Sequence, residues 1–425
     1  MRPMKILVIG GGGREHAIAF ALSRSQHAPQ LFVAPGNPGI AALATCVDIP
    51  VDNINKLLSF AQTEKIDMTI VGPELPLSLG VVDTFRNAGL PIMGPTRMAA
   101  QLESSKSFAK SFMDRHHIPT AKWGTFTDIA KALHYLKSQQ YPVVIKADGL
   151  AAGKGVVIAQ TADEAQKTLS DWMGGKQLGG AGQSVVIEEF LQGREISMIA
   201  IADGEKAVLL QSAADHKRAY DGDQGPNTGG MGAVSPVPWV NAALVERVRT
   251  EILEPTIAGM ALDGMPFSGF LYMGIMVVGQ TPHVLEYNVR LGDPEAQALL
   301  PRLQTDFVEL CGRSAAVALY QQEQLKWDSR SSVCVVMAAE GYPGTVVTGS
   351  EIQGIPSPTE DAVVFQAGTC MKDEKLQTAG GRVLGVTALG DTLEGAQYRA
   401  YDVAKKIRWK GAWYRHDIGK SLVKL

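Results

Sequence analysis

Leu285–Gln297, with the sequence LEYNVRLGDPEAQ, begins as an apolar strand and ends in a dense group of polar residues. Glu286 and Asn288 stand two residues apart, so on a strand both side chains point to one face, and Arg290 falls on that face as well. A carboxylate and an amide oxygen side by side are hard ligands of the kind that Mg²⁺ prefers, usually together with nucleotide phosphates. An edge strand with a solvated polar face explains this segment equally well when it is taken alone.

The composition is that of a soluble globular protein: 45% of the 425 residues are hydrophobic and 20% are charged. This length predicts about three domains. A net charge of -3 argues against nonspecific nucleic-acid binding, which needs a basic surface. The amino terminus lacks a secretory signal, no apolar run approaches the ~20 residues that span a bilayer, and the four cysteines have no metal-type spacing. We therefore expect a cytoplasmic protein with free thiols and neither nucleic-acid nor membrane partners.

Strands alternate with helices in the amino-terminal part of the chain, a pattern typical of βαβ units and a parallel sheet. Loops rich in glycine and proline follow the strands, so we expect the ligand at the carboxyl ends of the strands. The predicted strands are Lys5–Ile9, Leu31–Ala34, Met68–Val71 and Pro91–Gly94.

The glycine run Gly10–Gly13 resembles a dinucleotide-binding turn, but two features argue against that function. The third fingerprint position carries Glu15 or His16, and the second strand ends in Ala34-Pro35-Gly36 without the acidic residue that holds a ribose. A glycine turn at a helix N-terminus still offers backbone N–H groups to an anion. We expect Gly11–Gly13 to bind a phosphate or carboxylate other than that of NAD, with a simple tight turn as the alternative.

A second glycine-rich loop, Asp148–Gly155, follows the predicted strand Pro142–Ala147. It lacks the hydroxyl residue of a P-loop, yet such a hairpin can lay backbone N–H groups over phosphates. Lys146, near the end of the strand, then contacts the phosphates as a point charge. Gly153 and Gly155 are the glycines of this loop that we assign to the nucleotide.

The apolar strand Val185–Ile187 turns polar at its end, which suits an adenine slot. Glu188 begins the polar part, and the backbone groups of Glu189 and Leu191 suit the edge of the base, while Glu195 could take the ribose hydroxyls. Surface hairpins often carry Glu and Lys, so each piece alone is weak evidence.

The hydrophobic pattern elsewhere in the chain predicts two long helices and one domain boundary. Ser104–His117 is predicted to be a helix with Ser104 as its N-cap and Lys106 in its first turn. Leu244–Met260 is predicted to be one amphipathic helix. Gln321–Ser332 is polar and interrupts the alternation, so we place a domain boundary there.

Taken together, these segments resemble the ATP-grasp superfamily and, within it, the phosphoribosylamine–glycine ligase (glycinamide ribonucleotide synthetase) family. The resemblance runs nearly end to end. The segments that carry it are GGGREH at Gly11–His16, APGNPG at Ala34–Gly39, GPELPL at Gly72–Leu77, IKADGLAAGKGV at Ile145–Val156, DHKR at Asp215–Arg218, GPNTGGMG at Gly225–Gly232, RLGDPEAQ at Arg290–Gln297 and GGRVLGVTALG at Gly380–Gly390.

The resemblance implies an α/β fold whose ATP-grasp part is α+β. A Rossmann-like parallel sheet domain is expected at residues 1–103, a two-lobed ATP-grasp domain at 104–328 with a nucleotide lid at about 122–192, and a small α/β domain at 329–425. The implied reaction joins glycine to 5-phosphoribosylamine with ATP, through glycyl phosphate, in de novo purine synthesis. We expect a monomer.

Phosphoryl transfer relies on positioning and charge neutralisation, which agrees with the residue types found. By the resemblance, ATP is held by Lys106, Lys146, Gly153, Gly155, Glu188, Glu189, Leu191 and Glu195, and Mg²⁺ or Mn²⁺ by Glu286 and Asn288. Catalytic roles fall to Arg290, Lys146 and Asp215. Glycine and phosphoribosylamine are enclosed by Gly12, Gly13, Arg14, Glu15, Asn37, Gly39, Glu74, Asp215, Lys217, Arg218, Gly229, Gly230, Arg290, Gly292, Asp293 and Pro294.

Three departures from the wider pattern and one ambiguous residue accompany this interpretation. Leu271–Gly274 lacks the additional carboxylate of many ATP-grasp enzymes, Gly11 replaces a frequent Asn, and Leu291 replaces a usual Phe. His216 is as compatible with a structural role as with a catalytic one.

Three alternative functions stay open from the sequence. Another ATP-grasp ligase, such as a carboxylase or formyl-transfer enzyme of purine synthesis, would use bicarbonate or formate in place of glycine. An NAD(P)-dependent oxidoreductase would bind nicotinamide without affinity for ATP. A non-catalytic nucleotide-binding module would bind ATP without turnover.

Overall fold

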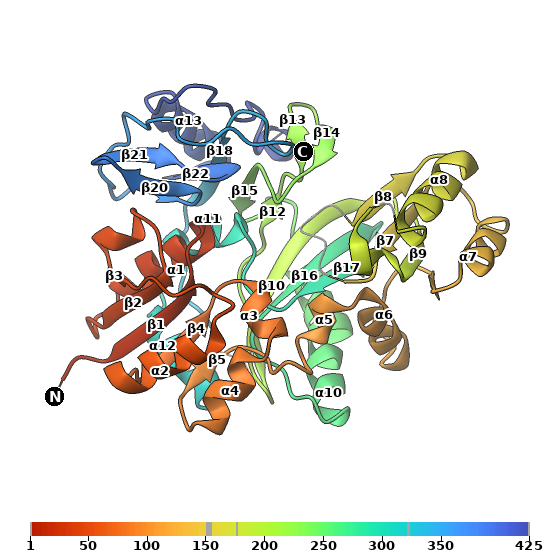
Figure 1. The fold of residues 1–425 in the computed structure, drawn as a ribbon, viewed down its shortest axis with the longest axis horizontal. Coiled ribbons are helices and arrows are strands. Elements are labelled where there is room, and N and C mark those ends of the chain that lie inside the picture. Colours follow the sequence, from red (N-terminus) through yellow and green to blue (C-terminus); the bar gives the residue numbers. More distant parts are fainter. Residues whose placement is uncertain (1, 150–154, 176, 321–323, 424–425) are drawn as a thin grey trace.

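The computed structural model describes residues 2–149, 155–175, 177–320 and 324–423. An amino-terminal parallel sheet and a carboxy-terminal antiparallel sheet lie one above the other, and a small lobe projects from a central antiparallel sheet (Figure 1). The predicted α/β fold with an α+β central part is confirmed. None of the described helices is both long and apolar enough to cross a bilayer.

The amino-terminal sheet has the strand order β3-β2-β1-β4-β5, and all neighbouring strands run parallel. Its inner strands are buried on both faces, because Val8 and Ile9 point to opposite faces and both are fully buried. This double burial explains the β-branched runs in the sequence. The elements are β1 Lys5–Gly10, α1 Gly13–Ser23, β2 Gln30–Pro35, the 3₁₀ turn η1 Ile40–Ala42, β3 Thr45–Cys46, α2 Ile54–Glu64, β4 Met68–Val71, α3 Glu74–Ser78, α4 Val81–Asn87 and β5 Ile92–Met93.

The central sheet has the order β11-β10-β16-β17 and is antiparallel. Two sequence predictions are corrected here. Ser105, and not Ser104, caps α6, because its hydroxyl accepts from Phe108 N. The single helix predicted over Leu244–Met260 contains a π-helical turn, η3. The elements are α5 Gln101–Ser104, α6 Lys106–Arg115, β10 Arg194–Asp203, β11 Ala207–Leu209, α9 Ala242–Val248, η3 Arg249–Leu253, α10 Glu254–Leu262, β16 Ser268–Val278, β17 Thr281–Asn288, α11 Glu295–Leu299, the 3₁₀ turn η4 Leu300–Arg302 and α12 Phe307–Ala315.

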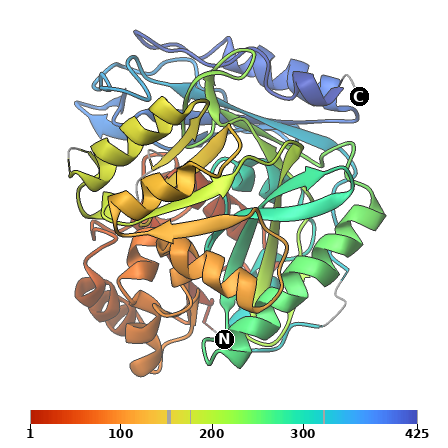
Figure 2. The same cartoon turned by 90° about the vertical axis from the view of Figure 1, so that its right-hand side faces the viewer.

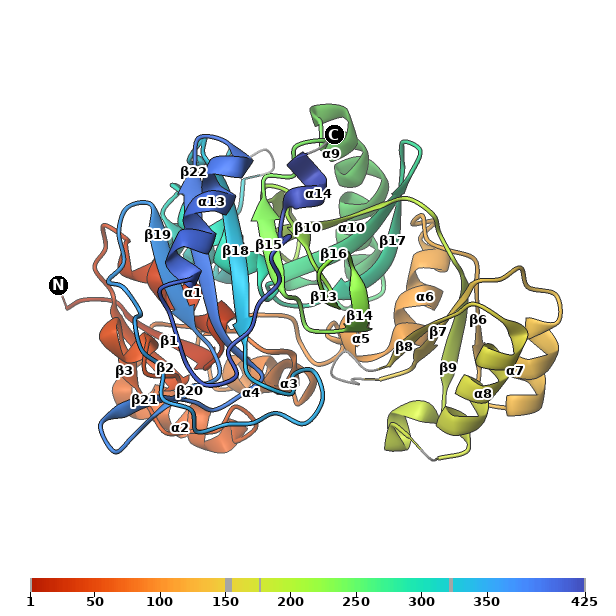
Figure 3. The same cartoon turned by 90° about the horizontal axis from the view of Figure 1, so that it is seen from above.

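The projecting lobe is a four-stranded antiparallel sheet of order β6-β9-β7-β8, with two helices packed against it. This lobe faces the viewer in Figure 2 and lies at the right of Figure 3, on the far side of the central strands from the amino-terminal sheet. Its elements are β6 Trp123–Phe126, α7 Ile129–Leu136, β7 Val143–Ala147, β8 Val156–Ala159, α8 Ala162–Met173, the 3₁₀ turn η2 Gly179–Gly182 and β9 Val185–Glu189.

The carboxy-terminal sheet has the order β12-β15-β18-β22-β19 and takes two of its strands from the middle of the chain. The strands β12 and β15 flank the DHKR and GPNTGGMG segments, so this sheet helps to position both. The elements are β12 Ala214–Asp215, β13 Arg218–Tyr220, β14 Gln224–Asn227, β15 Gly232–Ser235, β18 Ser331–Ala338, β19 Ala362–Gln366, β20 Thr369–Lys372, β21 Lys375–Thr378, β22 Arg382–Gly390, α13 Leu393–Ala404 and α14 Lys420–Val423.

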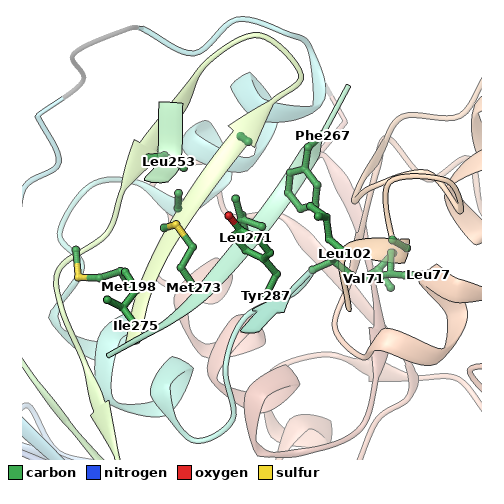
Figure 4. Packing of buried hydrophobic residues seen from close by; sticks show 14 of the residues in the cluster. Val71, Leu77, Leu102, Met198, Leu253, Phe267, Leu271, Met273, Ile275 and Tyr287 are labelled. Carbon is green, nitrogen blue, oxygen red and sulfur yellow. The ribbon is translucent and has the colours of Figure 1, made fainter. Parts of the chain in front are cut away.

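A continuous apolar core joins the central sheet to the amino-terminal domain. Leu271 and Met273 of β16 pack near Tyr287 of β17, and the same core extends to Val71 and Leu77 (Figure 4). All five side chains are at most 3% exposed. The polar end of β17 is therefore held by packed, rigid elements.

Candidate active site

Strand β17 carries three polar side chains toward one cavity. Glu286 and Asn288 both pair with β16 and lie two residues apart, so their side chains share a face. Arg290 lies two residues beyond the end of the strand, and all three residues line a cavity of about 660 Å³. The common face predicted from the sequence is present in the structure.

Arg290 is held by acidic partners from the amino-terminal part of the chain. Its Nη2 lies 3.0 Å from Glu103 Oε1, and its Nε lies 3.5 Å from Glu74 Oε2. The guanidinium also donates to Asn288 Oδ1 at 3.1 Å and to the Leu291 carbonyl at 3.2 Å. Burial lowers the pKa of Arg290, but Glu103 and Glu74 outweigh burial and hold that pKa above its usual value. A fixed, permanently charged guanidinium thus stands beside the predicted metal ligands.

A buried carboxylate, Glu188, holds two lysines at the cavity wall. Its Oε1 lies 2.8 Å from Lys146 Nζ, and its Oε2 lies 2.8 Å from Lys110 Nζ. Lys146 also donates to the Leu285 carbonyl at 2.8 Å, and Lys110 to Thr120 Oγ1 at 2.7 Å. Burial lowers the pKa of Lys110 to about 8, against the opposing effect of Glu188. Both ammonium groups are fixed where a nucleotide's phosphates could meet them.

The first turn of α6 brings a further lysine to the same wall and touches the glycine-rich loop. Lys106 Nζ donates to the Gly149 carbonyl at 3.4 Å, and the Asp148 carboxylate accepts from Ser107 N at 3.3 Å. Sequence reasoning did not single out Lys110, although its spacing of four from Lys106 places both on one helix face. Within the loop, the predicted Gly155 lines the cavity, whereas the predicted Gly153 lies outside the described residues.

Glu286 has the properties of a ligand for a hard cation. In the described part of the chain, no hydrogen-bond donor satisfies its carboxylate. Burial raises its pKa, but Lys217 and Lys146 among other cations outweigh burial and hold that pKa below the usual value. Asn288 Oδ1 accepts one bond from Arg290 and retains a second lone pair. An ionised carboxylate beside an amide oxygen fits Mg²⁺.

The DHKR segment places a buried carboxyl group next to a lysine. Lys217 Nζ forms an ion pair with Glu195 and lies 3.9 Å from Asp215 Oδ1. Burial raises the pKa of Asp215 to about 8 despite the opposing charge of Lys217, and the nearby Glu295 adds to the increase. A carboxyl group with a pKa near neutrality can exchange a proton during a reaction.

The loop after Arg290 is fastened by a residue from the carboxy-terminal domain. Arg382 Nη1 donates to the carbonyl groups of Asp293 and Gly229, both at 2.6 Å, and its Nη2 lies 3.1 Å from Asp293 Oδ2. Asp293 Oδ1 accepts from Gln297 Nε2 at 2.7 Å. Arg382 therefore joins two predicted substrate segments. Arg382 lies in the segment Gly380–Gly390 that contributed to the family resemblance, but it was not assigned to the site, because its partners lie in other parts of the chain.

The amino-terminal glycine turn reaches the cavity through Arg14. Its Nε lies 2.6 Å from Glu15 Oε1, and its Nη1 donates to the Leu291 carbonyl at 3.3 Å. Glu15 Oε2 accepts from the Gly12 N–H at 2.6 Å. The N–H of Gly12 thus binds its own helix's Glu15, and Arg14 is the residue of this turn that lines the cavity.

Two predicted substrate residues of the APGNPG segment serve the local architecture. Asn37 Nδ2 donates to the carbonyls of Gly11 and Gln366 at 2.9 and 2.8 Å, and its Oδ1 accepts from Ile40 N at 3.0 Å. Gly39 lies against His16 and leaves no room for a side chain. These contacts hold the loop in place without lining the cavity.

The first cavity gathers most of the charged residues that the sequence predicted. The predicted residues that line it, charged and uncharged, are Arg14, Glu74, Lys106, Lys146, Gly155, Glu188, Asp215, Lys217, Gly229, Glu286, Asn288, Arg290 and Asp293. Gly12, Gly13, Glu15, Asn37, Gly39, Gly230, Gly292 and Pro294 stand outside this lining. Lining residues that sequence reasoning did not select include Glu103, Lys110, Tyr272, Glu295, Tyr342 and Arg382.

A second cavity of about 620 Å³ adjoins the first one and contains the residues predicted for the adenine slot. Apolar side chains from the lobe and the central sheet, among them Ile158, Leu191 and Met276, form its walls. The predicted residues Glu188, Glu189, Leu191 and Glu195 line it as well. So does Arg218, which was assigned to the substrates; its Nη1 donates to the Gly225 carbonyl at 2.8 Å. Lys146 and the predicted metal ligand Glu286 line both cavities, so the two cavities adjoin beside Glu286.

Comparison with known families covers nearly the whole chain. Three models of phosphoribosylglycinamide synthetase match in sequence order: the N domain at residues 4–103, the ATP-grasp (A) domain at 104–296 and the C domain at 332–421. A phosphoribosylamine–glycine ligase from Allochromatium vinosum is 51% identical over 424 residues, which is 99% of each chain.

Solved structures agree with this similarity. The crystal structure of a phosphoribosylamine–glycine ligase from Thermotoga maritima is similar with a TM-score of 0.86 and 34% identity, covering 98% of this chain and 100% of that one. The biotin carboxylase domain of a Hydrogenobacter thermophilus 2-oxoglutarate carboxylase, in complex with MgADP and bicarbonate, has a TM-score of 0.74 at 17% identity and covers 96% and 91%. The second likeness concerns the fold alone.

Proposed function

The chain belongs to the phosphoribosylglycinamide synthetase family, and we propose from this that it ligates glycine to 5-phosphoribosylamine with ATP. The products are glycinamide ribonucleotide, ADP and phosphate, and the reaction is a step of de novo purine synthesis. The observation that carries the proposal is the common face of Glu286, Asn288 and Arg290, which opens into a cavity lined by Lys106 and Lys146.

The reaction needs two steps because a carboxylate is a poor electrophile. A carboxylate oxygen of glycine attacks the γ-phosphorus of ATP, ADP leaves, and glycyl phosphate forms. The amine of phosphoribosylamine then attacks the acyl carbon, phosphate leaves, and the amide bond forms. Lys106 and Lys146 hold phosphate oxygens, while Arg290 stabilises charge on the transferring phosphoryl group.

Glu286 and Asn288 would hold the divalent cation, because they offer two oxygen ligands without a competing donor to the carboxylate among the described residues. When bound, the cation neutralises phosphate charge and withdraws electron density from the terminal phosphoryl group. We propose Mg²⁺ as the natural ion, with Mn²⁺ as a substitute.

Asp215 takes a proton in the second step. The attacking amine becomes positively charged when the new C–N bond forms and must lose a proton to give the amide. Because burial raises the pKa of Asp215 to about 8, this group can accept and release a proton near neutral pH. Lys217 keeps its side chain in place, and Arg14, Glu74, Gly229 and Asp293 enclose the two small substrates.

ADP release in the presence of both co-substrates tests the function. The purified protein is incubated with MgATP, glycine and phosphoribosylamine formed from ribose 5-phosphate and ammonia, and glycinamide ribonucleotide is detected by mass spectrometry. We expect ADP release to require both glycine and phosphoribosylamine. Turnover with bicarbonate or formate and none with glycine would instead assign the chain to another ATP-grasp activity.

We further propose that the protein acts as a monomer in the cytoplasm. The reducing cytoplasm keeps the four cysteines as thiols. Gel filtration with light scattering measures the assembly state directly.

A further inference from the structure

Two residues near the carboxy-terminal end of the described chain line the second cavity. Ser421 and Leu422 belong to α14 and stand in the wall that also contains Phe190 and Leu191 of the predicted adenine slot. Leu422 is partly buried against the main apolar core. Figure 3 shows α14 close to α13 and the central strands. In the sequence, this helix lies more than a hundred residues after the other residues that are predicted to bind the nucleotide.

The first anchor of this segment is His216 of the DHKR motif. Its Nε2 accepts a hydrogen bond from Gly419 N at 3.1 Å. Burial and the nearby Arg415 lower the pKa of His216 to about 4, so the ring is neutral at working pH and Nε2 is free to accept. Backbone hydrogen bonds to Gly232 and from Met231, at 2.9 and 2.8 Å, fix His216 itself.

The second anchor is the buried residue that precedes Gly419. Ile418 is fully buried, its N–H donates to Tyr401 Oη at 3.0 Å, and its carbonyl accepts from Gln397 Nε2 at 2.7 Å. Gly419 has a φ of +81°, a left-handed conformation that residues with a side chain rarely adopt. The chain therefore turns at one defined place and enters α14 in one direction.

The third anchor ties the segment to a hairpin of the same cavity. Arg415 is 2% exposed and donates to Asp417 Oδ1 at 2.8 Å, to Asp223 Oδ1 at 2.9 Å and to the Arg218 carbonyl at 3.0 Å. Asp417 Oδ2 accepts from Gly222 N at 2.8 Å. Because Arg218 and Asp223 line the second cavity, the segment and the hairpin form one continuous wall.

We propose that Ser421 and Leu422 form a wall of the adenosine pocket and that His216 is the positioning residue that holds this wall in place. The proposal rests on the proposed function in one respect, namely that the second cavity takes the adenosine part of the nucleotide. Asp215 and Lys217 line both cavities, and His216 lines the second one. His216 alone of the three binds the carboxy-terminal segment, through its bond from Gly419 N.

Calorimetric titration of the full chain with MgADP measures nucleotide affinity directly and does not depend on the ligation reaction. Leu422→Ala is expected to raise the Kd for MgADP roughly three- to tenfold through lost apolar contact. Lys420→Ala is the matched control, because Lys420 is exposed on the same short helix and does not line the cavity. We expect it to keep the Kd of the unaltered protein.

Two substitutions of His216 separate positioning from proton transfer. His216→Ala should raise the Kd for MgADP and the KM for ATP by a similar factor to Leu422→Ala, with little change in kcat or in the KM for glycine. His216→Gln offers a side-chain oxygen to Gly419 N–H and should restore the original values. Thermal melting checks folding, and Leu422→Ala supplies the result if His216→Ala does not fold.

Three outcomes would contradict the proposal that α14 forms a wall of the adenosine pocket. The first is an unchanged Kd for MgADP in Leu422→Ala. The second is a fall in kcat of roughly a hundredfold in both His216 variants at unchanged Kd, because that pattern indicates a proton-transfer role. The third is absence of MgADP binding by the unaltered protein, which also removes the nucleotide assignment. By contrast, MgADP binding without glycine-dependent turnover removes the proposed function alone.

Discussion

Arg382 and Asp293 join the carboxy-terminal domain to the loop that follows the predicted metal ligands. The guanidinium donates to the Asp293 carbonyl at 2.6 Å and lies 3.1 Å from its carboxylate. Burial raises the pKa of Asp293, but Arg382 and Arg14 outweigh burial and hold that pKa below its usual value. One arginine thus fixes both the position and the charge of a substrate-loop residue.

Removal of this guanidinium should impair both activity and stability. In Arg382→Ala the Asp293 carboxylate stays largely buried without its ion pair, so we expect a loss of about 2 kcal/mol in the free energy of unfolding. Displacement of the loop should reduce kcat/KM for the ligation roughly ten- to a hundredfold. Urea unfolding and steady-state kinetics measure the two effects.

Arg399→Ala is the matched control for activity. Arg399 also lies in the carboxy-terminal domain, but it is 41% exposed, pairs with Asp361 and donates to the Leu389 carbonyl without contacting the substrate loop. A surface pair contributes about 0–1 kcal/mol, so this variant should keep its activity. Equal losses in the two variants would mean that the link to Asp293 has no special role.

A lysine at position 290 should not support normal activity, although it retains the positive charge. The guanidinium contacts Glu103, Glu74, Asn288 and the Leu291 carbonyl together, and an ammonium group cannot match this planar set of donors. We expect Arg290→Lys to lower kcat/KM roughly a hundredfold and stability by about 2 kcal/mol. Arg249→Lys, in an exposed network with Glu246 and Glu254, should change stability by less than about 0.5 kcal/mol. Near-normal turnover of Arg290→Lys would show that the several simultaneous contacts of the guanidinium are not needed for activity.

The sequence predicted features that depend on local periodicity. The period of two in β17 placed Glu286 and Asn288 on one face, and the structure has both lining one cavity. Runs of β-branched residues predicted the parallel sheet, since strands buried on both faces carry apolar side chains at every position. The order of the glycine-rich loops along the chain resembles that of a known family, and this resemblance predicted the ATP-grasp fold of the central domain.

Features that depend on distant contacts escaped prediction. Glu103 reaches the cavity from a segment without any chemical signature of its own. Arg382 lies in a segment that contributed to the family resemblance, yet its role in the site comes from partners far away in the sequence and was not predicted. The strand β12 has only two residues and carries no periodic signal, yet it extends the carboxy-terminal sheet. Ser104 and Ser105 are equivalent caps by composition, and only the backbone geometry selects Ser105.

Glu286→Gln should abolish turnover while leaving the fold intact. The amide is similar in shape but carries no charge, so the affinity for the cation falls and kcat should decrease at least about a hundredfold at ordinary Mg²⁺ concentrations. The variant should still fold with only a modest loss of stability, because the side chain loses the attraction of Lys217 and Lys146 but no hydrogen bond among the described residues.

Titration of activity with MgCl₂ gives a second readout, since the half-saturating concentration should rise in Glu286→Gln. Glu394→Gln, at an exposed position in the first turn of α13, should behave like the unaltered protein. If Glu286→Gln retains full activity and the original Mg²⁺ dependence, the cation must bind elsewhere.

Acid should destabilise the protein through His16. Burial lowers the pKa of His16 to about 4, and its Nδ1 accepts from Gln366 N at 2.8 Å, a bond that protonation would break. Below pH 6.5 the unfolded chain binds a proton at this residue and the folded chain does not. Stability therefore falls as the pH falls from 6.5 toward 4, and His16 alone should account for about 2 kcal/mol between pH 6.5 and 4.5.

Urea unfolding of the unaltered protein and of His16→Gln at pH 6.5, 5.5 and 4.5 measures this contribution. The glutamine oxygen can still accept from Gln366 N, but it does not titrate, so the variant should lose about 2 kcal/mol less than the unaltered protein over this range. The exposed His134 provides the control, since His134→Gln should keep the original pH dependence. Parallel stability curves for the unaltered protein and His16→Gln would show that His16 has the same pKa in the folded protein as in the unfolded chain, contrary to its burial against Phe365.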